Sequence, residues 1–568
     1  MCLLIIKMKR KIVNLLKFTG LDKEILEGVI EVPKDSNMGD YAFPCFLLAK
    51  KLKKNPIEIA RDIASKTKKG KDFERIEASG AYVNFFVDRK KLAGEVIDNV
   101  AKKGNKYGSG KPKKETIMIE FSQPNTHKAF HFGHVRGTSL GESIARIIEF
   151  SGGKAIRANY SGDTGMHIAK WLWCYRKYHS KEKIIDNEKW FADIYVDAVK
   201  RLEKNEDLQK EVDGINKKLD LGDDKDLNNL WKETRRLSIS SWNKIYHELN
   251  TKFDVHYFES EFEKAGKEIA SSLVKNKIAE VSEGATIVNF KKYSKNMGVI
   301  VLLRKDGTVL YGAKDISLAK KKFKDYNLKK SIYVIGKEQD LHIHQIFEIL
   351  KMMKFEHSND LEYVPVTEIR FPWGKMSSRS GDNVIYSDFK SQIVNYASKE
   401  VEKRYKELDG AEIFDRALAI SIAAIKYSLL KQDVNKNIIF NPKEEIKFEG
   451  DTGPYLLYSY ARALSILKKA NYKKQKKFKI TEIEDSEKRL IGEIGRLPEI
   501  VIESYNGLNP SVIAHYAYGL ARTFNEFYHS CQVIGSEQEQ FRLKLVDSFS
   551  QTLKNSLWLL GINVIPKM

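Results

Sequence analysis

The segment from residue 116 to residue 153 constrains the fold of this chain more than any other. Residues 116–121, TIMIEF, form an apolar run of strand length, and Pro124 and Asn125 mark a turn directly after it. A loop then leads into a long amphipathic helix. A strand followed by a basic loop at a helix N-terminus presents free backbone N–H groups to an anion. The loop residues concerned are His127, Lys128, His131, Gly133 and His134.

A second unit of the same kind follows at residues 156–170, where a strand leads into a loop with Gly162, Asp163 and Gly165 and then into a helix. Further strands are expected at residues 297–311, with a hairpin turn at Asp306 and Gly307, and at residues 330–336. Successive strand-loop-helix units predict a doubly wound parallel sheet of the Rossmann type. Its ligand should lie at the carboxyl ends of the strands.

The length of 568 residues exceeds what one core holds and predicts an α/β protein of three to five domains. We expect an N-terminal α+β domain at residues 1–112, ending in a linker rich in glycine, proline and lysine. The sheet domain should span 113–395, with a helical insertion at about 176–295. A helical connecting region at 396–450 and an all-α bundle at 451–568 complete the chain.

The charge of the chain favours a polyanionic partner. The sequence holds 98 Lys plus Arg against 76 Asp plus Glu, a formal net charge of +22. A basic surface of this size favours nucleic acid first. A solvated, lysine-rich surface without any partner explains the same number, so charge alone leaves both interpretations open.

The cysteines Cys2, Cys45, Cys174 and Cys531 are scattered without a C-x-x-C pair. This pattern argues against a disulfide framework and a structural zinc, and it fits a reducing cytoplasm. No apolar run approaches the length of a membrane span. The first residues make a poor signal peptide, and Met8 is an alternative start.

The last part of the bundle is expected to contain a long helix at residues 511–533 with two distinct faces. One face is apolar and belongs to a core. The other carries Tyr518, Arg522, Asn525 and His529 at steps of four and three. These side chains can stack on unpaired bases and hydrogen-bond to them, although a polar, solvated face is the simpler alternative.

Two kinds of site are compatible with His127, His131 and His134. Their spacing would let them share one helix face and hold a metal, but Pro124 and Gly133 oppose a continuous helix through them. A phosphate site fits better, because Gly133 lets the backbone approach triphosphate oxygens closely at the helix N-terminus.

Two motifs and their surroundings resemble a known family. Residues 131–134, HFGH, are similar to the HIGH signature of class I aminoacyl-tRNA synthetases, and residues 375–379, KMSSR, resemble their KMSKS loop. Each motif alone is weak, but their order on either side of a split sheet is more specific. The segments PNTHKAFHFGHVRG, NYSGDTGMHIAK, LYGAKDISLAKKKF, IGKEQDLHIHQ and DTGPYLLYSYAR resemble the arginyl-tRNA synthetases, and the likeness extends over nearly the whole chain.

The resemblance implies that the substrate side chain is a guanidinium, a planar cation that carboxylates and amide oxygens hold well. Without the resemblance, Glu120 and Asp315 could be ordinary ion-pair partners. The implied arginine ligands are Glu120, Asn125, Tyr311, Asp315 and Gln339.

The resemblance also implies the reaction. The arginine carboxylate attacks the α-phosphate of ATP, supplied with Mg²⁺, and the arginyl group then passes to the terminal adenosine of tRNA(Arg). No enzyme nucleophile is needed, so the protein positions the reactants and stabilises developing charge. The C-terminal bundle would bind the anticodon, which favours base contacts by Tyr518, Arg522, Asn525 and His529. The implied ATP-binding residues are His131, Gly133, His134, Lys375, Met376 and Ser377.

One position departs from the family pattern. The second lysine of KMSKS is Ser378 here, while Lys128 stands just ahead of the HIGH motif, where family members without that lysine carry one. We therefore expect Lys128 to be catalytic, together with His131, His134 and Lys375, by supplying the missing positive charge.

Three other functions are considered. A lysine-specific synthetase would not need two carboxylates around a planar cation, and a non-enzymatic RNA-binding relative would have little reason to hold all these residues. A metal-dependent hydrolase built on the histidines is the third. We expect a monomer with no tightly bound cofactor and no membrane partner, and with ATP, L-arginine and tRNA(Arg) as its ligands.

Overall fold

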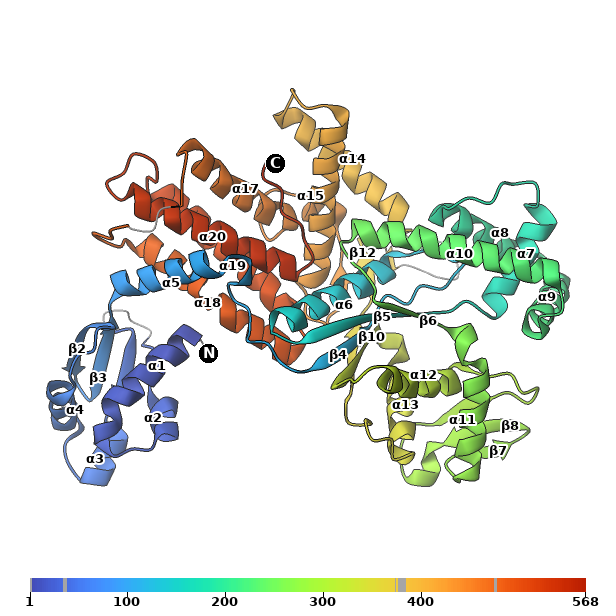
Figure 1. The fold of residues 1–568 in the computed structure, drawn as a ribbon, viewed down its shortest axis with the longest axis horizontal. Helices are drawn as coiled ribbons and strands as arrows, with labels where there is room; N and C mark the ends of the chain where they lie inside the picture. The colour runs from blue at the N-terminus through green and yellow to red at the C-terminus, as the bar shows by residue number, and fades with distance from the viewer. Residues whose placement is uncertain (1–2, 34–37, 373, 376–384, 475–477) are drawn as a thin grey trace.

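The computed structural model describes residues 3–33, 38–372, 374–375, 385–474 and 478–568. Its centre is a five-stranded parallel sheet (Figure 1) with the strand order β11-β10-β4-β5-β6. The predicted doubly wound sheet is therefore confirmed. The strands are β4 (Thr116–Glu120), β5 (Lys154–Ser161), β6 (Val255–Phe258), β10 (Lys330–Gly336) and β11 (Leu361–Val366).

The order of the strands creates a switch point between β4 and β10. The chain first extends the sheet from β4 through β5 to β6, and later extends it from β4 in the other direction through β10 to β11. Glu120 pairs with Ala158 on one side and with Tyr333 on the other. Connections leave such a point in opposite directions, so a crevice opens at the carboxyl ends of β4 and β10.

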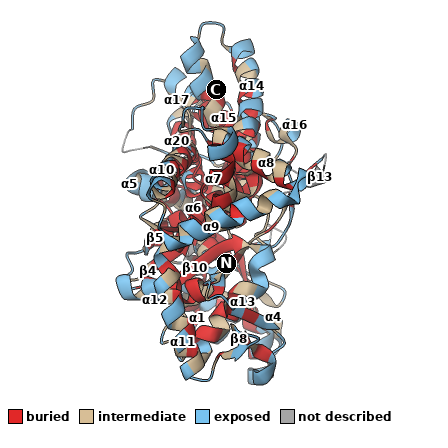
Figure 2. Ribbon diagram, turned by 90° about the vertical axis from the view of Figure 1, so that its right-hand side faces the viewer, coloured by how far each residue is buried: buried red, intermediate tan, exposed pale blue. Residues whose placement is uncertain are grey.

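Helix α6 (Phe132–Phe150) follows β4 and is buried along nearly its whole length. It lies between the sheet and the C-terminal helices (Figure 1). A Cβ atom at Gly141 would lie 2.1 Å from the Phe121 ring, so glycine is required for this close approach to the end of β4. Figure 2 shows that buried residues concentrate in α6 and the strands around it. No described helix is long and apolar enough to cross a membrane.

The C-terminal region is the predicted all-α bundle, and its core is continuous with α6 and β4. The boundary expected between residues 395 and 396 is wrong, because α14 runs unbroken across it with buried residues on both sides. The bundle helices are α14 (Tyr386–Arg404), α15 (Gly410–Leu430), α17 (Gly453–Lys469), α18 (Asp485–Gly507), α19 (Ser511–Ser530) and α20 (Glu539–Leu559).

The N-terminal α+β domain is also confirmed, and it has an apolar cluster of its own. Helix α5 (Arg89–Lys103) contributes only the partly buried Leu92 to that cluster. Its apolar residues, Val96 among them, pack instead with α18 and α20, so the compact domain ends near Val87 rather than at residue 112. The domain contains α1 (Leu3–Leu16), α2 (Lys23–Val29), β1 (Tyr41–Pro44), α3 (Phe46–Leu52), α4 (Pro56–Lys66), β2 (Phe73–Ser79) and β3 (Tyr82–Val87).

The helical insertion is shorter than expected. Residues 255–295, expected to be mostly helix, instead supply β6 to the central sheet and the short strands β7 (Glu280–Ser282) and β8 (Ala285–Asn289). These two strands form a small antiparallel sheet with β9 (Val299–Leu303), which lies where a strand was expected. Strands of three to five residues are too short to show a clear alternation. The insertion helices are α7 (Met166–Tyr178), α8 (Glu188–Lys204), α9 (Gln209–Leu221) and α10 (Lys225–Glu248).

The predicted turn at Asp306 and Gly307 is confirmed. Gly307 has a φ of 83°, and Leu303 and Val309 form an antiparallel bridge across the turn. A positive φ at this position favours glycine over other residues.

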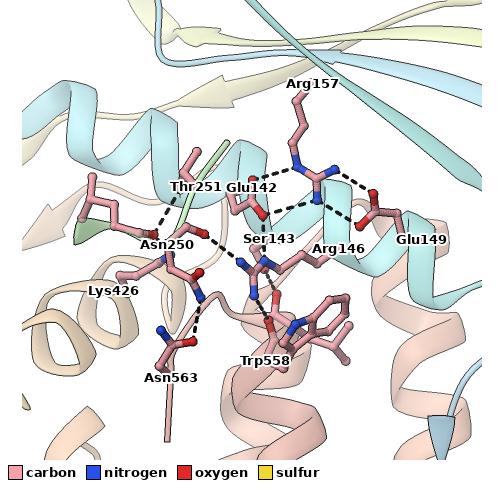
Figure 3. Close-up of polar contacts among 12 residues, drawn as sticks. Glu142, Ser143, Arg146, Glu149, Arg157, Asn250, Thr251, Lys426, Trp558 and Asn563 are labelled. Carbon is pink, nitrogen blue, oxygen red and sulfur yellow. Dashed lines mark hydrogen bonds and ion pairs between the residues drawn. The ribbon is translucent and has the colours of Figure 1, made fainter. Parts of the chain in front are cut away.

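Buried charges hold α6 between its neighbours (Figure 3). Arg157 of β5 donates to Glu142 at 2.8 Å, and Glu142 also accepts from Arg146 at 2.7 Å. Arg146 continues to the backbone carbonyls of Trp558 and Asn250, at 3.0 and 2.7 Å. One network therefore joins the central sheet, α6, the residues after α10 and the last helix of the bundle.

Replacement of Arg157 by leucine should destabilise the protein by about 3 kcal/mol, because the buried carboxylate of Glu142 keeps Arg146 but loses the other of its two cationic partners. The side chains of Arg157 and Glu142 are only 2% and 1% exposed. Urea denaturation followed by tryptophan fluorescence measures the effect. Lys210→Ala is the matched control, since its ion pair with Asp207 is exposed, and it should leave the midpoint unchanged. Equal midpoints for the two variants would contradict a structural role for Arg157.

Candidate active site

The carboxyl ends of the central strands surround a cavity of about 380 Å³. Five residues expected to bind arginine all line it, although they lie far apart in the sequence. They are Glu120, Asn125, Tyr311, Asp315 and Gln339.

Local structure explains how these side chains reach the cavity. Glu120 is the last residue of β4, and Asn125 lies in the turn that follows. Tyr311 is the first residue of α12 (Tyr311–Asp325), so Asp315 lies one turn further on the same face. Gln339 ends the short helix that follows β10.

Glu120 already has a partner inside the protein. Lys322 of α12 is fully buried and forms an ion pair with it, and Gln123 donates to its other oxygen at 3.1 Å. Burial alone would lower the pKa of Lys322, but Glu120 and the nearby Tyr333 outweigh that effect and raise it. Glu120 is thus the ion-pair partner that its position at a strand end suggested. It still faces the cavity.

Asp315 is paired in the same way. Its carboxylate lies 2.6 Å from Nε2 of His342 in α13 (Asp340–Met352). Burial lowers the pKa of His342, but the hydrogen bond and the charge of Asp315 reverse this and raise it above its ordinary value. A cation that binds Asp315 would therefore compete with a proton on His342.

Glu259 is a third carboxylate in the cavity, and the sequence did not predict it. It follows β6 directly and is 8% exposed. Burial raises its pKa to about 7, Lys314 opposes the shift, and Asp315 adds to it. The residue was missed because β6 was not recognised as a strand of the central sheet. Its position after a strand end would otherwise have pointed to the site.

The loop after β5 shapes the cavity around Glu259. A Cβ atom at Gly162 would lie 2.3 Å from Oδ1 of Asn125 and 3.1 Å from Oε1 of Glu259, so glycine leaves room for both. The next residue, Asp163, is fully buried and accepts from the backbone and hydroxyl of Ser260 at 2.9 and 2.7 Å. Asp163 therefore fixes the segment that carries Glu259.

Tyr160 supplies an unused polar group to the same cavity. Its hydroxyl is buried and has no hydrogen-bond partner within the described part of the chain. Burial, with the charges of Asp315 and Glu259, raises its pKa well above the ordinary value. The hydroxyl is therefore neutral at physiological pH and available to a ligand.

The predicted phosphate-binding residues lie beside this cavity. His131 is the residue before α6 and His134 lies in its first turn, with ring centroids 3.9 Å apart. Nδ1 of His134 lies 3.0 Å from the carbonyl oxygen of Ser122. Burial, then the charge of Lys128, lowers the pKa of His131 to about 4; burial, with His131 next, lowers the pKa of His134 well below its ordinary value. Both rings are neutral, so they act on a ligand through hydrogen bonds rather than charge.

The three histidines do not form a metal site. His127 is fully buried and points away from the other two, toward the insertion. Its Nε2 lies 2.7 Å from the hydroxyl of Thr234, and its ring packs against Trp171. Burial lowers its pKa to about 3, so His127 is a neutral core residue. This geometry disfavours a hydrolase built on these histidines.

One group of three ligand types does converge within the described ranges, namely Cys174, His179 and Asp197 in the insertion. Asp197 already accepts from Arg201 at 2.7 Å. Burial, with Asp197 next, raises the pKa of Cys174 to about 12, which disfavours the thiolate that metals bind. The group is a hydrogen-bond cluster.

Lys128 lies close enough to Glu259 and to the paired histidines for their charges to interact. No carboxylate lies within 4 Å of its ammonium group among the residues described, and that group lies 5.2 Å from the ring centroid of Tyr195. Burial lowers its pKa, the charge of Lys170 adds to this, and Glu259 opposes it. Lys128 is thus a cation without a carboxylate partner beside the HIGH-like motif.

Only the first residue of the KMSKS-like motif at residues 375–379 belongs to the described part of the chain. Its backbone enters through β13 (Gly374–Lys375), which pairs with β12 (Ile369–Phe371). Met376, Ser377 and Ser378 lie outside the described residues. After the motif, Ile385 forms a backbone bridge with His131, so the chain returns directly to the first motif.

Three family models together match almost the entire chain. The arginyl tRNA synthetase N terminal domain matches residues 6–87, the catalytic domain of class I tRNA synthetases (R) matches residues 96–442, and the DALR anticodon binding domain matches residues 456–568. The chain belongs to the arginyl-tRNA synthetase family. Similarity to individual arginine–tRNA ligases, in sequence and in structure, supports this assignment.

The arginine–tRNA ligase of Clostridium perfringens is 36% identical over 559 residues, which cover 96% of this chain and 97% of that protein. That of Halothermothrix orenii is 33% identical and covers 99% of this chain and 100% of its own. The arginyl-tRNA synthetase of Thermus thermophilus, at 24% identity, covers 99% of both chains with a TM-score of 0.78, so it shares the fold.

In this synthetase, the four residues expected to form an exposed polar face on α19 (Ser511–Ser530) are exposed only in part. Arg522 and His529 are exposed, and Tyr518 is half-buried against Tyr455. Asn525 is buried, donates to Tyr455 at 2.8 Å and accepts from Arg462. The prediction of an exposed Asn525 is wrong, because α17 covers this part of the face, which the periodicity of one helix does not reveal.

A second cavity, of about 620 Å³, opens between α17, α19 and the C-terminal residues. The guanidinium of Arg462 lies 4.6 Å from the ring centroid of Tyr458 and 5.0 Å from that of Tyr528. Two phenol rings and a guanidinium around one hollow form a surface on which a base can stack. Asn525 contributes to it indirectly by holding Arg462.

Proposed function

We propose that this chain activates L-arginine with ATP and transfers the arginyl group to the 3′-terminal adenosine of tRNA(Arg). The observation that carries this proposal is the cavity at the switch point. It gathers three carboxylates, three amides and phenol groups beside two stacked neutral histidines at the start of α6. Membership of the arginyl-tRNA synthetase family supports the same reaction.

The carboxylates bind the guanidinium of arginine. Glu120 and Asp315 accept its N–H groups, Glu259 adds a third negative charge, and the hydroxyl of Tyr311 is a further polar partner. Asn125 and Gln339 complete the set of polar groups. A lysine ammonium is a compact point charge, so it could not donate hydrogen bonds to all of these separated acceptors at once. This argument disfavours a lysine-specific enzyme.

The ATP half of the reaction lies at the N-terminus of α6. His131, the backbone of Gly133 and His134 contact the triphosphate of ATP, whose Mg²⁺ arrives with it as part of the substrate. An oxygen of the arginine carboxylate attacks the α-phosphorus, and pyrophosphate leaves with the bonding electrons. Lys128 and Lys375 stabilise the charge on the leaving group. The family resemblance adds Met376 and Ser377 to the proposed ATP-binding residues.

Transfer RNA binds through the C-terminal bundle. Arg522, His529 and Tyr518 contact anticodon-loop nucleotides, and one base stacks in the hollow at Tyr458 and Tyr528. The net charge of +22 attracts the negatively charged phosphate backbone of the transfer RNA. A hydroxyl of the terminal adenosine then attacks the arginyl carbonyl and loses its proton as AMP leaves. We further propose that the enzyme acts as a monomer in the cytoplasm, and the scattered cysteines without a C-x-x-C pair support a reducing compartment.

The proposed function predicts ATP–pyrophosphate exchange that depends on arginine alone among the amino acids. The measurement supplies each amino acid separately, with and without transfer RNA. A non-enzymatic relative would give no exchange under any condition, and exchange with lysine would indicate the lysine-specific alternative.

Replacement of Lys128 by alanine should slow exchange about a hundredfold, because one preorganised cation at the leaving group is lost. Lys128→Arg should retain more activity than Lys128→Ala. Lys170→Ala is the matched control, since that lysine lies nearby but does not line the arginine cavity. A rate for Lys128→Ala within a fewfold of the unmodified enzyme would remove Lys128 from the mechanism.

Arginine should bind about tenfold more tightly at pH 8 than at pH 6, because the fraction of binding-competent enzyme rises over this range. The pKa of Glu259 is about 7, so this residue loses its proton and becomes an anion as the pH rises. The raised pKa of His342 acts in the same direction, since deprotonation frees Asp315. Calorimetric titration with arginine measures the affinities.

Glu259→Gln is the control for that prediction. It should weaken arginine binding at pH 8 and flatten the dependence on pH, leaving only the contribution of His342. An unchanged slope would show that Glu259 does not face the bound cation.

A further inference from the structure

The insertion helices α8 and α10 contact both parts of the chain that form the ATP half of the site. On one side, Ser238 and Thr234 of α10 hydrogen-bond to the backbone and ring of His127, at 3.1 and 2.7 Å. On the other side, α8 and α10 contact the start of α14, directly after the second motif. Figure 1 shows α10 running above α6 toward α14.

Glu188, the first residue of α8, makes the closest of these contacts. Its side chain accepts a hydrogen bond from the hydroxyl of Ser387 in the first turn of α14. Glu188 is 5% exposed. Burial raises its pKa to about 7, against the opposing effects of Ser387 and of the backbone of Phe130.

Glu248, at the end of α10, makes a parallel contact with the same turn. It accepts from the hydroxyl of Tyr386 at 2.9 Å and from Lys390 at 2.7 Å. Tyr386 is fully buried, and its ring packs against Phe130. Two carboxylates from the insertion thus hold two consecutive residues of α14.

Those two residues follow the point where α14 meets the HIGH-like motif. The backbone N–H of Tyr386 donates to the carbonyl of Phe130 at 3.0 Å, and Ile385 bridges to His131. Any shift of the first turn of α14 therefore moves a backbone partner of the residue that precedes α6.

A purely stabilising role does not explain the choice of residue at position 188. Burying a carboxylate costs free energy, and a well-packed apolar side chain would stabilise the contact at least as well. The next residue shows the contrast. Lys189 forms an ion pair with Asp388 at 2.9 Å, but both side chains are about half exposed, at 51% and 48%, so that pair contributes little. The buried hydrogen bond instead defines one position of α14.

We propose that Glu188 is a positioning residue for ATP, which, with Glu248, fixes the start of α14 against Phe130 and His131 and so holds the ATP-binding motif at the start of α6 in position. This inference rests on the proposed function, since it assigns ATP to that motif. It gives the insertion a role in the reaction without direct contact to either substrate.

The test compares Glu188→Ala with the unmodified enzyme in arginine-dependent exchange. The KM for ATP should rise about tenfold and kcat should fall, as expected for the loss of a hydrogen bond to a charged group. The KM for arginine should not change, because Glu188 does not line the arginine cavity. Glu188→Gln keeps an acceptor for Ser387 and should restore most of the activity. Lys189→Ala, one residue away, should behave as the unmodified enzyme does.

Two further variants keep the test decisive if Glu188→Ala does not fold. Ser387→Ala and Tyr386→Phe each remove one hydroxyl and should raise the KM for ATP in the same direction. If Glu188→Ala folds, Ser387→Ala should add nothing in that background. Parallel changes in the KM values for ATP and arginine, or an unchanged KM for ATP, would overturn the proposal.

Direct binding separates this inference from the proposed function. Titration with a non-hydrolysable ATP analogue should show weaker binding to Glu188→Ala, while calorimetric titration with arginine should give equal affinities. An unmodified enzyme without arginine-dependent exchange would refute the proposed function. Equal affinity of both proteins for the analogue would refute the role of Glu188 alone.

Discussion

The pairing of Glu142 with Arg157 and Arg146 is the contact on which the arrangement of the catalytic centre depends. These side chains are almost completely buried, so none can lose its partner without a large cost in free energy. Glu142 and Arg146 lie in the second half of α6 and Arg157 in β5, whereas His131 and His134 lie at the start of α6. Because a helix transmits a constraint along its axis, fixing one end against the sheet and the bundle also fixes the histidines relative to the cavity.

The cavity shows how a chain can present several carboxylates before its cationic ligand arrives. Glu120 is balanced by Lys322, and Asp315 by His342. Glu259 has no such partner among the described residues, and its raised pKa shows the cost. A bound guanidinium would relieve that cost, so the site is preorganised for a cation rather than merely negative.

The sequence predicted the parts of the fold whose signals are local. The apolar run at residues 116–121 and the Asp306-Gly307 turn needed no tertiary context. The convergence of five distant residues on one cavity followed from the family resemblance. Glu259 was missed because a four-residue strand carries little periodicity, and Asn525 was misjudged because another helix covers it. Helices α5 and α14 cross the expected boundaries because their apolar faces pack with the bundle.

The insertion was the part of the chain with the least informative sequence, since a charged amphipathic helix is compatible with many roles. What distinguishes it in the structure is the direction of a few polar residues. Thr234, Ser238, Glu188 and Glu248 all face the segments that carry the ATP-binding motifs. Loops at the carboxyl end of a parallel sheet have no neighbouring strand on their outer side, so another element must hold them. Polar residues are suited to this task, because a hydrogen bond specifies position where apolar packing permits sliding.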